Sequence, residues 1–97
     1  MLYALICTDK PGAGLDLRRR NRPDHLAWLD SLGDRLKLAG PFMNESGEEP
    51  RGSLVVIEAA DMAAAEALAS EDPYAKAGVF EAVDIRPWKW LLPRQEG

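Results

Sequence analysis

Near the middle of the chain stands the apolar run Ser53-Leu54-Val55-Val56-Ile57-Glu58, which follows a polar segment rich in Gly and Glu, residues 44–52. A short run with β-branched residues, bounded by turn-forming residues, is typical of a strand. Residues 36–39 alternate between apolar and polar and end at Gly40-Pro41. The two runs together predict a β-hairpin.

Toward the N-terminus, residues 1–7 are apolar and lead into a Pro- and Gly-containing loop, residues 10–14, as expected of a buried strand. A helical pattern follows over residues 15–36. Because the missing N–H of proline costs nothing in the first helical turn, we expect the main helix to begin near Pro23. One face of this helix, which we expect to pack on a sheet, has three-to-four spacing: His25, Trp28, Leu29, Leu32 and Leu36.

Toward the C-terminus, Asp61 stands where a helix N-cap belongs, ahead of the alanine-rich residues 62–69. Asp72-Pro73-Tyr74 is typical of a further cap, with proline in the first helical position. Residues 79–86 then alternate loosely before Pro87 and predict a last strand.

These elements follow one another in the order βαββαβ. This order predicts a ferredoxin-like α+β fold, in which a four-stranded antiparallel sheet carries both helices on one face. The other face of such a sheet is a large apolar patch in a chain this short. We therefore expect two sheets to press together in a two-fold homodimer.

Length and composition limit the classes of protein that fit. The chain has 97 residues, 46% of them apolar and 29% charged, so we expect one globular domain over residues 1–97. A net charge of -4 argues against binding to nucleic acid or to an anionic membrane. No apolar stretch is long enough for a membrane helix. The single cysteine, Cys7, forms no internal disulfide, which favours the cytoplasm.

His25 is the only histidine and the only side chain expected to titrate near neutral pH without help. It is either a core histidine with one ring nitrogen satisfied by the backbone, or a general base. In the first turn after Pro23, the positive end of the helix would favour the neutral, proton-accepting imidazole.

Two carboxylates are candidates to orient His25. Asp72 precedes Pro73, so a purely capping role is one interpretation of it. A carboxylate fixed at a helix start can also hold one nitrogen of an imidazole and leave the other for a substrate. Asp9, just past the first strand, is the rival candidate.

Arginines 18, 19, 20 and 22 form a basic cluster, which is either a solvated face or an anion-binding one. Arg18, Arg22 and His25 are spaced four and three residues apart, so a helix that continued through Pro23 would align them. An arginine fork could then meet a substrate carboxylate or phosphate.

Several signals of other chemistry are missing. One histidine and one cysteine do not make a usual zinc site, so we expect no metal. Gly12 and Gly14 lack the third glycine of a dinucleotide fingerprint, and no P-loop lysine pattern occurs, so we expect no cofactor. Trp28 fits the core, and Trp88 and Trp90 fit a terminal strand that covers a dimer interface.

The whole pattern resembles the YciI-like proteins of the dimeric α+β barrel superfamily. The resemblance lies in a set of motifs that occur in order along nearly the whole chain: Met1-Leu2-Tyr3, Asp9-Lys10, Arg22-Pro23-x-His25-Leu26, Ala39-Gly40-Pro41, Gly52-Ser53, Asp72-Pro73-Tyr74, residues 77–81 and the closing Val83-x-Ile85-x-Pro87-Trp88-Lys89.

This resemblance implies a ferredoxin-like protomer that pairs into a dimeric α+β barrel, with His25 and Asp72 as an active-site pair. It makes Arg18, Arg22, Gly40, Pro41, Pro73 and Tyr74 candidates for substrate binding. A related dehydrochlorinase and the muconolactone isomerases of the superfamily imply proton transfer on small ring compounds. The alternative hypotheses are a non-catalytic module that binds a small molecule or another protein, and a purely structural His25.

Overall fold

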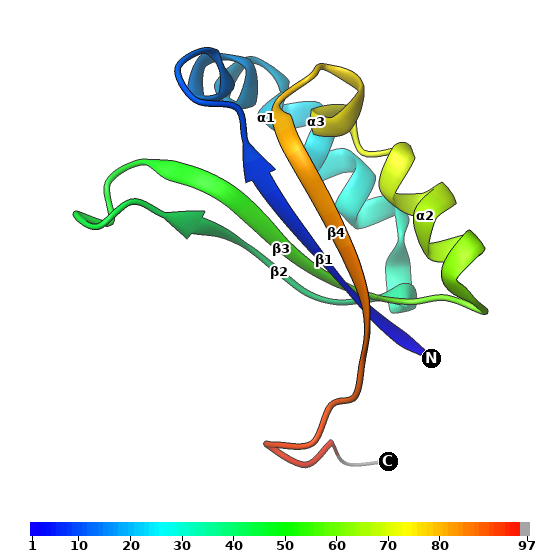
Figure 1. Cartoon of the computed structure of the whole chain (residues 1–97). Coiled ribbons are helices and arrows are strands. Elements are labelled where there is room, and N and C mark those ends of the chain that lie inside the picture. The colour runs from blue at the N-terminus through cyan, green and yellow to red at the C-terminus, as the bar shows by residue number, and fades with distance from the viewer. Residues whose placement is uncertain (96–97) are drawn as a thin grey trace.

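The computed structural model describes residues 1–95. Its elements follow the predicted βαββαβ order, with a 3-10 helix added after the first α-helix and a short helix following the predicted cap at Asp72 (Figure 1). In chain order they are β1 (Leu2–Asp9), α1 (Ala13–Ser31), the 3-10 helix η1 (Gly33–Arg35), β2 (Leu36–Met43), β3 (Pro50–Glu58), α2 (Met62–Ser70), α3 (Pro73–Lys76) and β4 (Phe80–Trp88).

The four strands form one antiparallel sheet in the order β2-β3-β1-β4. The α-helices lie together on one face of this sheet, as Figure 1 shows from the opposite side. This arrangement is the ferredoxin-like α+β fold, and it confirms the fold predicted from the order of the elements. The predicted hairpin is also confirmed, since β2 pairs with β3.

The hydrophobic core lies between the sheet and the helices. Register fixes which strand residues reach it, because residues directly opposite one another share a face. Tyr3, Leu5 and Cys7 of β1 lie opposite Ile57, Val55 and Ser53 of β3. The buried members of the core are Tyr3, Leu5, Cys7, Leu29, Leu32, Val55, Ile57, Ala59 and Ala65, with Trp28 half-buried against them.

The predicted start of the main helix is wrong, because α1 begins at Ala13 and continues through Pro23. Proline inside a helix costs about 3 kcal/mol through its lost N–H and its clash with the preceding turn. Both halves of α1 are tied to the rest of the molecule, which offsets this cost. Arg18 in the first half and His25 in the second are buried and bonded to other elements.

Leu36 does not belong to the helix face, which corrects the predicted end of α1. The helix stops at Ser31, and Gly33 adopts a φ of 56°, a conformation that favours glycine and turns the chain into η1. Leu36 then opens β2 opposite Ile57. The last strand also runs further than predicted, through Pro87. β4 is an edge strand, so the missing N–H of proline can face outward.

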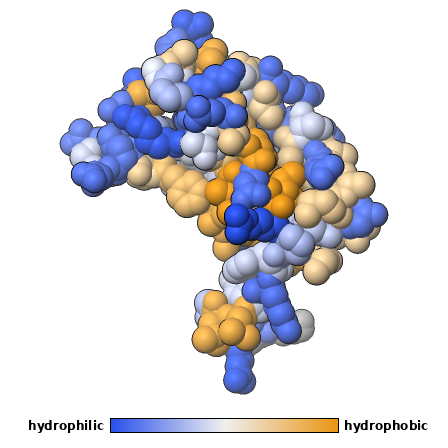
Figure 2. Space-filling model, in the orientation of Figure 1, coloured by the Kyte–Doolittle hydropathy of each residue, from blue (hydrophilic) through white to orange (hydrophobic). Residues whose placement is uncertain are grey.

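The second face of the sheet, here called the open face, carries no helix. Its residues alternate with the core residues along each strand and form facing pairs, such as Leu2 with Trp88 and Ile6 with Leu54. The apolar members are Leu2, Ala4, Ile6, Leu38, Phe42, Leu54, Val56 and Trp88. Figure 2, in the view of Figure 1, shows hydrophobic side chains gathered over the strands and crossed by a few polar ones. Within residues 1–95, no helix is long and apolar enough to cross a membrane.

Candidate functional site

The structure brings His25 and Asp72 together, although 47 positions separate them in the chain. Nδ1 of His25 lies 2.8 Å from Oδ1 of Asp72, and both side chains are buried. Asp72 is also the N-cap of α3, because the same Oδ1 accepts the backbone N–H of Tyr74 at 2.9 Å. Asp72 is therefore confirmed as a cap, and its carboxylate also contacts His25, as an orienting role requires.

The predicted electrostatic setting of His25 is wrong in one respect. His25 lies in the second half of α1 rather than in its first turn, so the positive end of that helix is distant. The imidazole ring is held by two residues: Asp72 contacts one ring nitrogen, and Tyr74 stacks on the ring face. The rings of His25 and Tyr74 stack with centroids 3.9 Å apart and planes 9° from parallel.

Tyr74 also contacts Arg18. The guanidinium carbon of Arg18 lies 4.6 Å from the centre of the Tyr74 ring, a cation–π contact. Arg18 and His25 are seven residues apart, about two turns of α1, and so project from the same side of the helix. Burial raises the pKa of Tyr74 above its ordinary value, although the charge of Arg18 acts in the opposite direction, and the phenol stays protonated at neutral pH.

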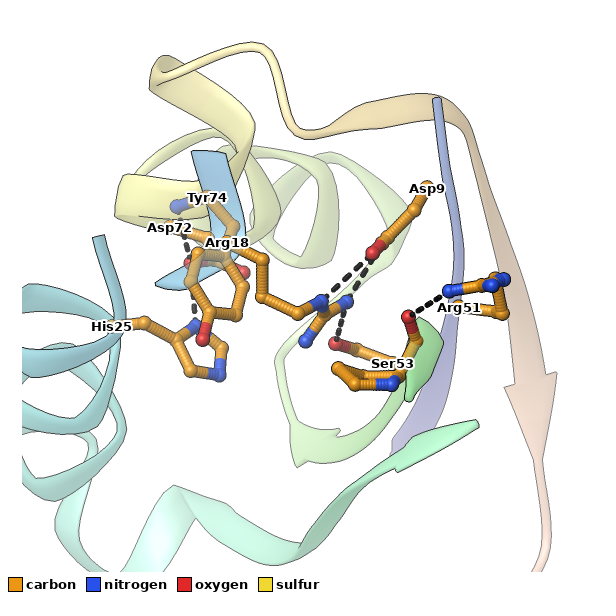
Figure 3. A network of polar contacts seen from close by, with 8 residues as sticks. Asp9, Arg18, His25, Arg51, Ser53, Asp72 and Tyr74 are labelled. Carbon is orange, nitrogen blue, oxygen red and sulfur yellow. Dashed lines mark hydrogen bonds and ion pairs between the residues drawn. The ribbon is translucent and has the colours of Figure 1, made fainter. Parts of the chain in front are cut away.

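Arg18 is held by Asp9 and Ser53 (Figure 3). Its Nε donates to Oδ2 of Asp9 at 2.8 Å, and its Nη2 donates to Oδ1 of Asp9 at 2.7 Å. Nη2 also donates to Oγ of Ser53 at 3.0 Å. Burial lowers the pKa of Arg18, but the hydrogen bonds and charge of Asp9 raise it above its ordinary value, so the guanidinium keeps its charge. Asp9, the rival candidate to orient His25, thus orients Arg18 instead.

A pocket of about 410 Å³ opens between α1 and the β2–β3 hairpin, and the His25 ring lines it. This volume is within the range of small-molecule sites in proteins. Apolar side chains form much of the wall, and charged ones come chiefly from α1. The lining residues are Arg18, Arg19, Arg22, His25, Leu26, Leu29, Ala39, Gly40, Pro41, Glu48, Pro50, Ser53, Val55 and Tyr74.

The basic cluster divides into three roles. Arg18 is buried and paired with Asp9, whereas Arg20 is exposed and forms an ion pair of 2.8 Å with Asp16. Arg19 and Arg22 are exposed and line the pocket. The alignment of Arg18, Arg22 and His25 does occur, because α1 continues through Pro23.

Most of the residues proposed to bind substrate lie at this pocket. Arg18, Arg22, Gly40, Pro41 and Tyr74 line it. Pro73 does not; it is half-buried at the start of α3, where its ring fits the first helical turn. Asp72 likewise stands behind His25 rather than in the pocket wall.

Sequence reasoning gave Ser53 no role in the site, and it did not single out Arg19 from the basic cluster. Ser53 comes to the site because β3 pairs with β1 in the register that places it opposite Cys7, on the helix side of the sheet. The sequence offered one signal for this role: Ser53 is a polar residue directly before the apolar run of residues 54–57. Arg19 reaches the pocket only because α1 begins well before Pro23.

Two further groups bear on the chemistry. Cys7 is buried beneath the site, and burial, followed by the charge of Asp72, raises its pKa to about 12, so its thiol is a poor nucleophile. Among residues 1–95, no three His, Cys, Asp or Glu side chains gather into a group that could hold a metal ion.

Comparison with known proteins places the chain in a family. The model of the YCII-related domain matches residues 1–89. The chain belongs to the YCII-related family. It is 41% identical to Protein YciI of Escherichia coli O6:H1 over 96 residues, which cover 92% of this chain and 97% of that protein. An uncharacterized protein from Haemophilus influenzae is 35% identical over 96 residues, with the same coverage of both chains.

Among solved structures, this YCII-related chain is similar to 5-chloro-2-hydroxyhydroquinone dehydrochlorinase (TftG) from Burkholderia phenoliruptrix AC1100, in complex with 2,5-dihydroxybenzoquinone. The TM-score is 0.83 at 30% identity, over 92% of this chain and 94% of that one. SnoaB, a cofactor-independent oxygenase from Streptomyces nogalater, shares the fold at a TM-score of 0.57 and 12% identity, over 96% of each chain.

Proposed function

We propose that this chain is a cofactor-independent enzyme that transfers a proton on a small anionic ring compound, with His25 as the acid–base residue. The observation that carries the proposal is the His25–Asp72 pair at the pocket. With Nδ1 turned to the Asp72 carboxylate, Nε2 is the ring nitrogen left to exchange a proton with a ligand. Figure 3 shows the outer nitrogen of His25 directed away from Asp72.

The pocket favours a flat, acidic ligand. Leu26, Leu29 and Val55 supply an apolar wall for a ring. Arg22 and Arg19, exposed and without an ion-pair partner among the described residues, supply charge for the acidic group of the ligand. The dehydrochlorinase, 30% identical to this chain, is bound to such a compound, an acidic dihydroxybenzoquinone. This likeness supports the hydroxyquinone class.

A proton-exchange assay with 2,5-dihydroxybenzoquinone tests the proposal without knowledge of the natural substrate. In D₂O, the imidazolium of His25 donates a deuteron to a ring carbon of the anion, and the electron pair for the new bond comes from the conjugated oxygen. Neutral His25 then removes the original proton from that carbon and returns the electron pair to the oxygen. Deuterium enters the ring, which ¹H NMR follows as loss of the ring C–H signal.

We expect the wild-type protein to accelerate this exchange and His25→Ala to lose about 10²-fold or more of the acceleration. No acceleration by the wild-type protein, or equal rates in both proteins, would contradict the proposal. If the probe binds equally to the wild type, His25→Ala and Asp72→Asn but none of them exchanges it, the protein is a binding module.

We also propose that two copies pair through the open face. Phe42 and Trp88 on this face are 44% and 38% exposed in the single chain, and together with Ile6 and Leu54 they form one apolar surface. A patch of this kind on a small domain marks an interface. A two-fold pairing buries the same patch on both copies.

A further inference from the structure

Arg18 has donor capacity that the protein itself leaves unused. Nε and Nη2 are occupied by Asp9 and Ser53, and no short hydrogen bond occupies Nη1; Tyr74 is the other described side chain that interacts with this guanidinium. Figure 3 shows this third nitrogen without a contact, directed into the space between His25 and Ser53. Arg18 is 5% exposed and lines the pocket, so the free edge of a fixed, charged guanidinium faces the ligand site.

Ser53 offers a second donor beside it. Its Oγ accepts a hydrogen bond from Arg18, so the hydroxyl proton is turned to another partner. No acceptor for that proton exists among residues 1–95, although Ser53 is only 3% exposed and lines the same pocket. A buried hydroxyl donor without an acceptor is costly unless a ligand or water supplies one.

The spacing of the two donors and His25 suits one small ring compound. Seven residues of α1 separate Arg18 from His25, a rise of about 10 Å along the helix. A six-membered ring with a carbon at His25 Nε2 can place a conjugated oxygen at the far side, near Arg18. The Asp9 carboxylate, bonded through both oxygens, keeps the guanidinium from turning.

We propose that Arg18 Nη1 and the Ser53 hydroxyl form an oxyanion-binding pair that stabilises the charge developed during proton transfer at His25. When His25 removes a proton from the ring carbon, the electron pair of the broken C–H bond moves through the ring to the conjugated oxygen. Arg18 and Ser53 donate hydrogen bonds to that oxygen, which is most negative after the proton has left. His25 exchanges this proton with the solvent before it donates one back to carbon, so that in D₂O a deuteron enters the ring.

This inference rests on the proposed acid–base function and makes Arg18 and Ser53 catalytic residues. Loss of one preorganised donor of this kind costs about 10²–10³-fold in rate. The test is the deuterium exchange of 2,5-dihydroxybenzoquinone, with kcat and KM measured separately. The variants are Ser53→Ala, Ser53→Thr and the control Ser31→Ala. In the wild type the exposed Ser31 hydroxyl donates a hydrogen bond to the backbone carbonyl of Trp28 at 2.6 Å.

We expect Ser53→Ala to lower kcat/KM about 10²-fold, because the conjugated oxygen carries charge both in the bound anion and in the transition state, and both lose a hydrogen-bond donor. Ser53→Thr, which keeps the hydroxyl, recovers at least tenfold of that loss, and Ser31→Ala behaves as the wild type. A Ser53→Ala protein with wild-type kcat/KM, or a Ser53→Thr protein that recovers none of the loss, would overturn the oxyanion pair.

The His25→Ala variant distinguishes failure of the proposed acid–base function from failure of the oxyanion-binding pair. Loss of exchange in His25→Ala with full exchange in Ser53→Ala overturns the oxyanion pair alone. Full exchange in His25→Ala, or no exchange by the wild type, overturns the acid–base function and the oxyanion pair with it.

Discussion

Oδ1 of Asp72 lies 2.8 Å from Nδ1 of His25, while the same oxygen accepts the N–H that begins α3. One carboxylate oxygen therefore caps the start of a helix and also holds an imidazole. The short helix in turn carries Tyr74, whose ring stacks on His25. The position of the His25 ring thus depends on a cap formed 47 residues further along the chain.

The two roles of Asp72 are separable by substitution. Asparagine caps a helix about as well as aspartate, so Asp72→Asn retains the cap but loses the charge that stabilises an imidazolium. We expect it to lower the rate of probe exchange at least about tenfold. Asp72→Ala loses the cap as well, which costs a further 1 kcal/mol or so in the free energy of unfolding. Urea unfolding and ¹H NMR measure the two effects.

Asp61→Asn is the matched control. Asp61 caps α2 by accepting the N–H of Ala64 at 2.9 Å and does not line the pocket. The Asp61→Asn variant should exchange the probe at the wild-type rate. An Asp72→Asn protein that exchanges the probe at the wild-type rate would remove Asp72 from the chemistry and leave it a cap.

The buried pair of Asp9 and Arg18 predicts a non-additive effect on stability. Removal of one partner leaves the other charge buried without a counter-charge, which costs about 3–5 kcal/mol. We expect Asp9→Ala to show a loss of this size in urea unfolding. The double variant Asp9→Ala/Arg18→Met should be more stable than Asp9→Ala alone, because no uncompensated charge remains. If the loss in the double variant equals the sum of the losses in Asp9→Ala and Arg18→Met, the two side chains do not interact in this way.

The sequence predicted the fold because its apolar runs and breakers agree with one order of elements. It also predicted the caps at Asp61 and Asp72, since capping is local chemistry. The predicted start of α1 is wrong because tertiary contacts, rather than local chemistry, decide where this helix begins. Proline at the first turn is a local preference, and the contacts of Arg18 with Asp9 and of His25 with Asp72 override it.

The candidate site was only partly predictable. Motif resemblance named His25 and Asp72 as candidates, and the structure brings them into contact. The pairing of Asp9 with Arg18 and the place of Ser53 depend on strand register and on the true start of α1. No spacing within the sequence encodes them, because each contact joins residues of different elements.

Cys7 predicts a change of stability at high pH. The folded chain holds the thiol proton to a pKa of about 12, whereas the ordinary value is 9.0. Between these values the unfolded chain has lost the proton and the folded chain has kept it, so the free energy of unfolding falls as pH rises above 9. From about pH 8 to about pH 10.5 we expect a loss of 1 to 2 kcal/mol from this group.

Cys7→Ala isolates this contribution. The variant has a smaller free energy of unfolding at pH 8, because a buried sulfur is replaced by a methyl group. Its decline toward pH 10.5 should be shallower than that of the wild type, as urea unfolding at each pH measures. Parallel declines in the two proteins would show that Cys7 is not the source.

The open face predicts the oligomeric state. Light scattering at micromolar concentration should give the mass of two chains. Ile6→Asp, which places a charge on the open face opposite Leu54, should give the mass of one chain. Ala67→Asp adds the same charge to an exposed position of α2 and should leave the dimer intact. A wild-type protein with the mass of a single chain contradicts the pairing.

The tautomer of His25 tests the central claim most directly, and a chain with one histidine gives one set of ring signals. A ¹H–¹⁵N correlation spectrum, taken at a pH where the ring is neutral, shows which nitrogen carries the proton. The account predicts the proton on Nδ1, donated to Asp72, with Nε2 bare toward the pocket, and loss of this preference in Asp72→Ala. A proton on Nε2 in the wild-type protein would contradict it, because the nitrogen at the pocket would then have no lone pair to accept a proton.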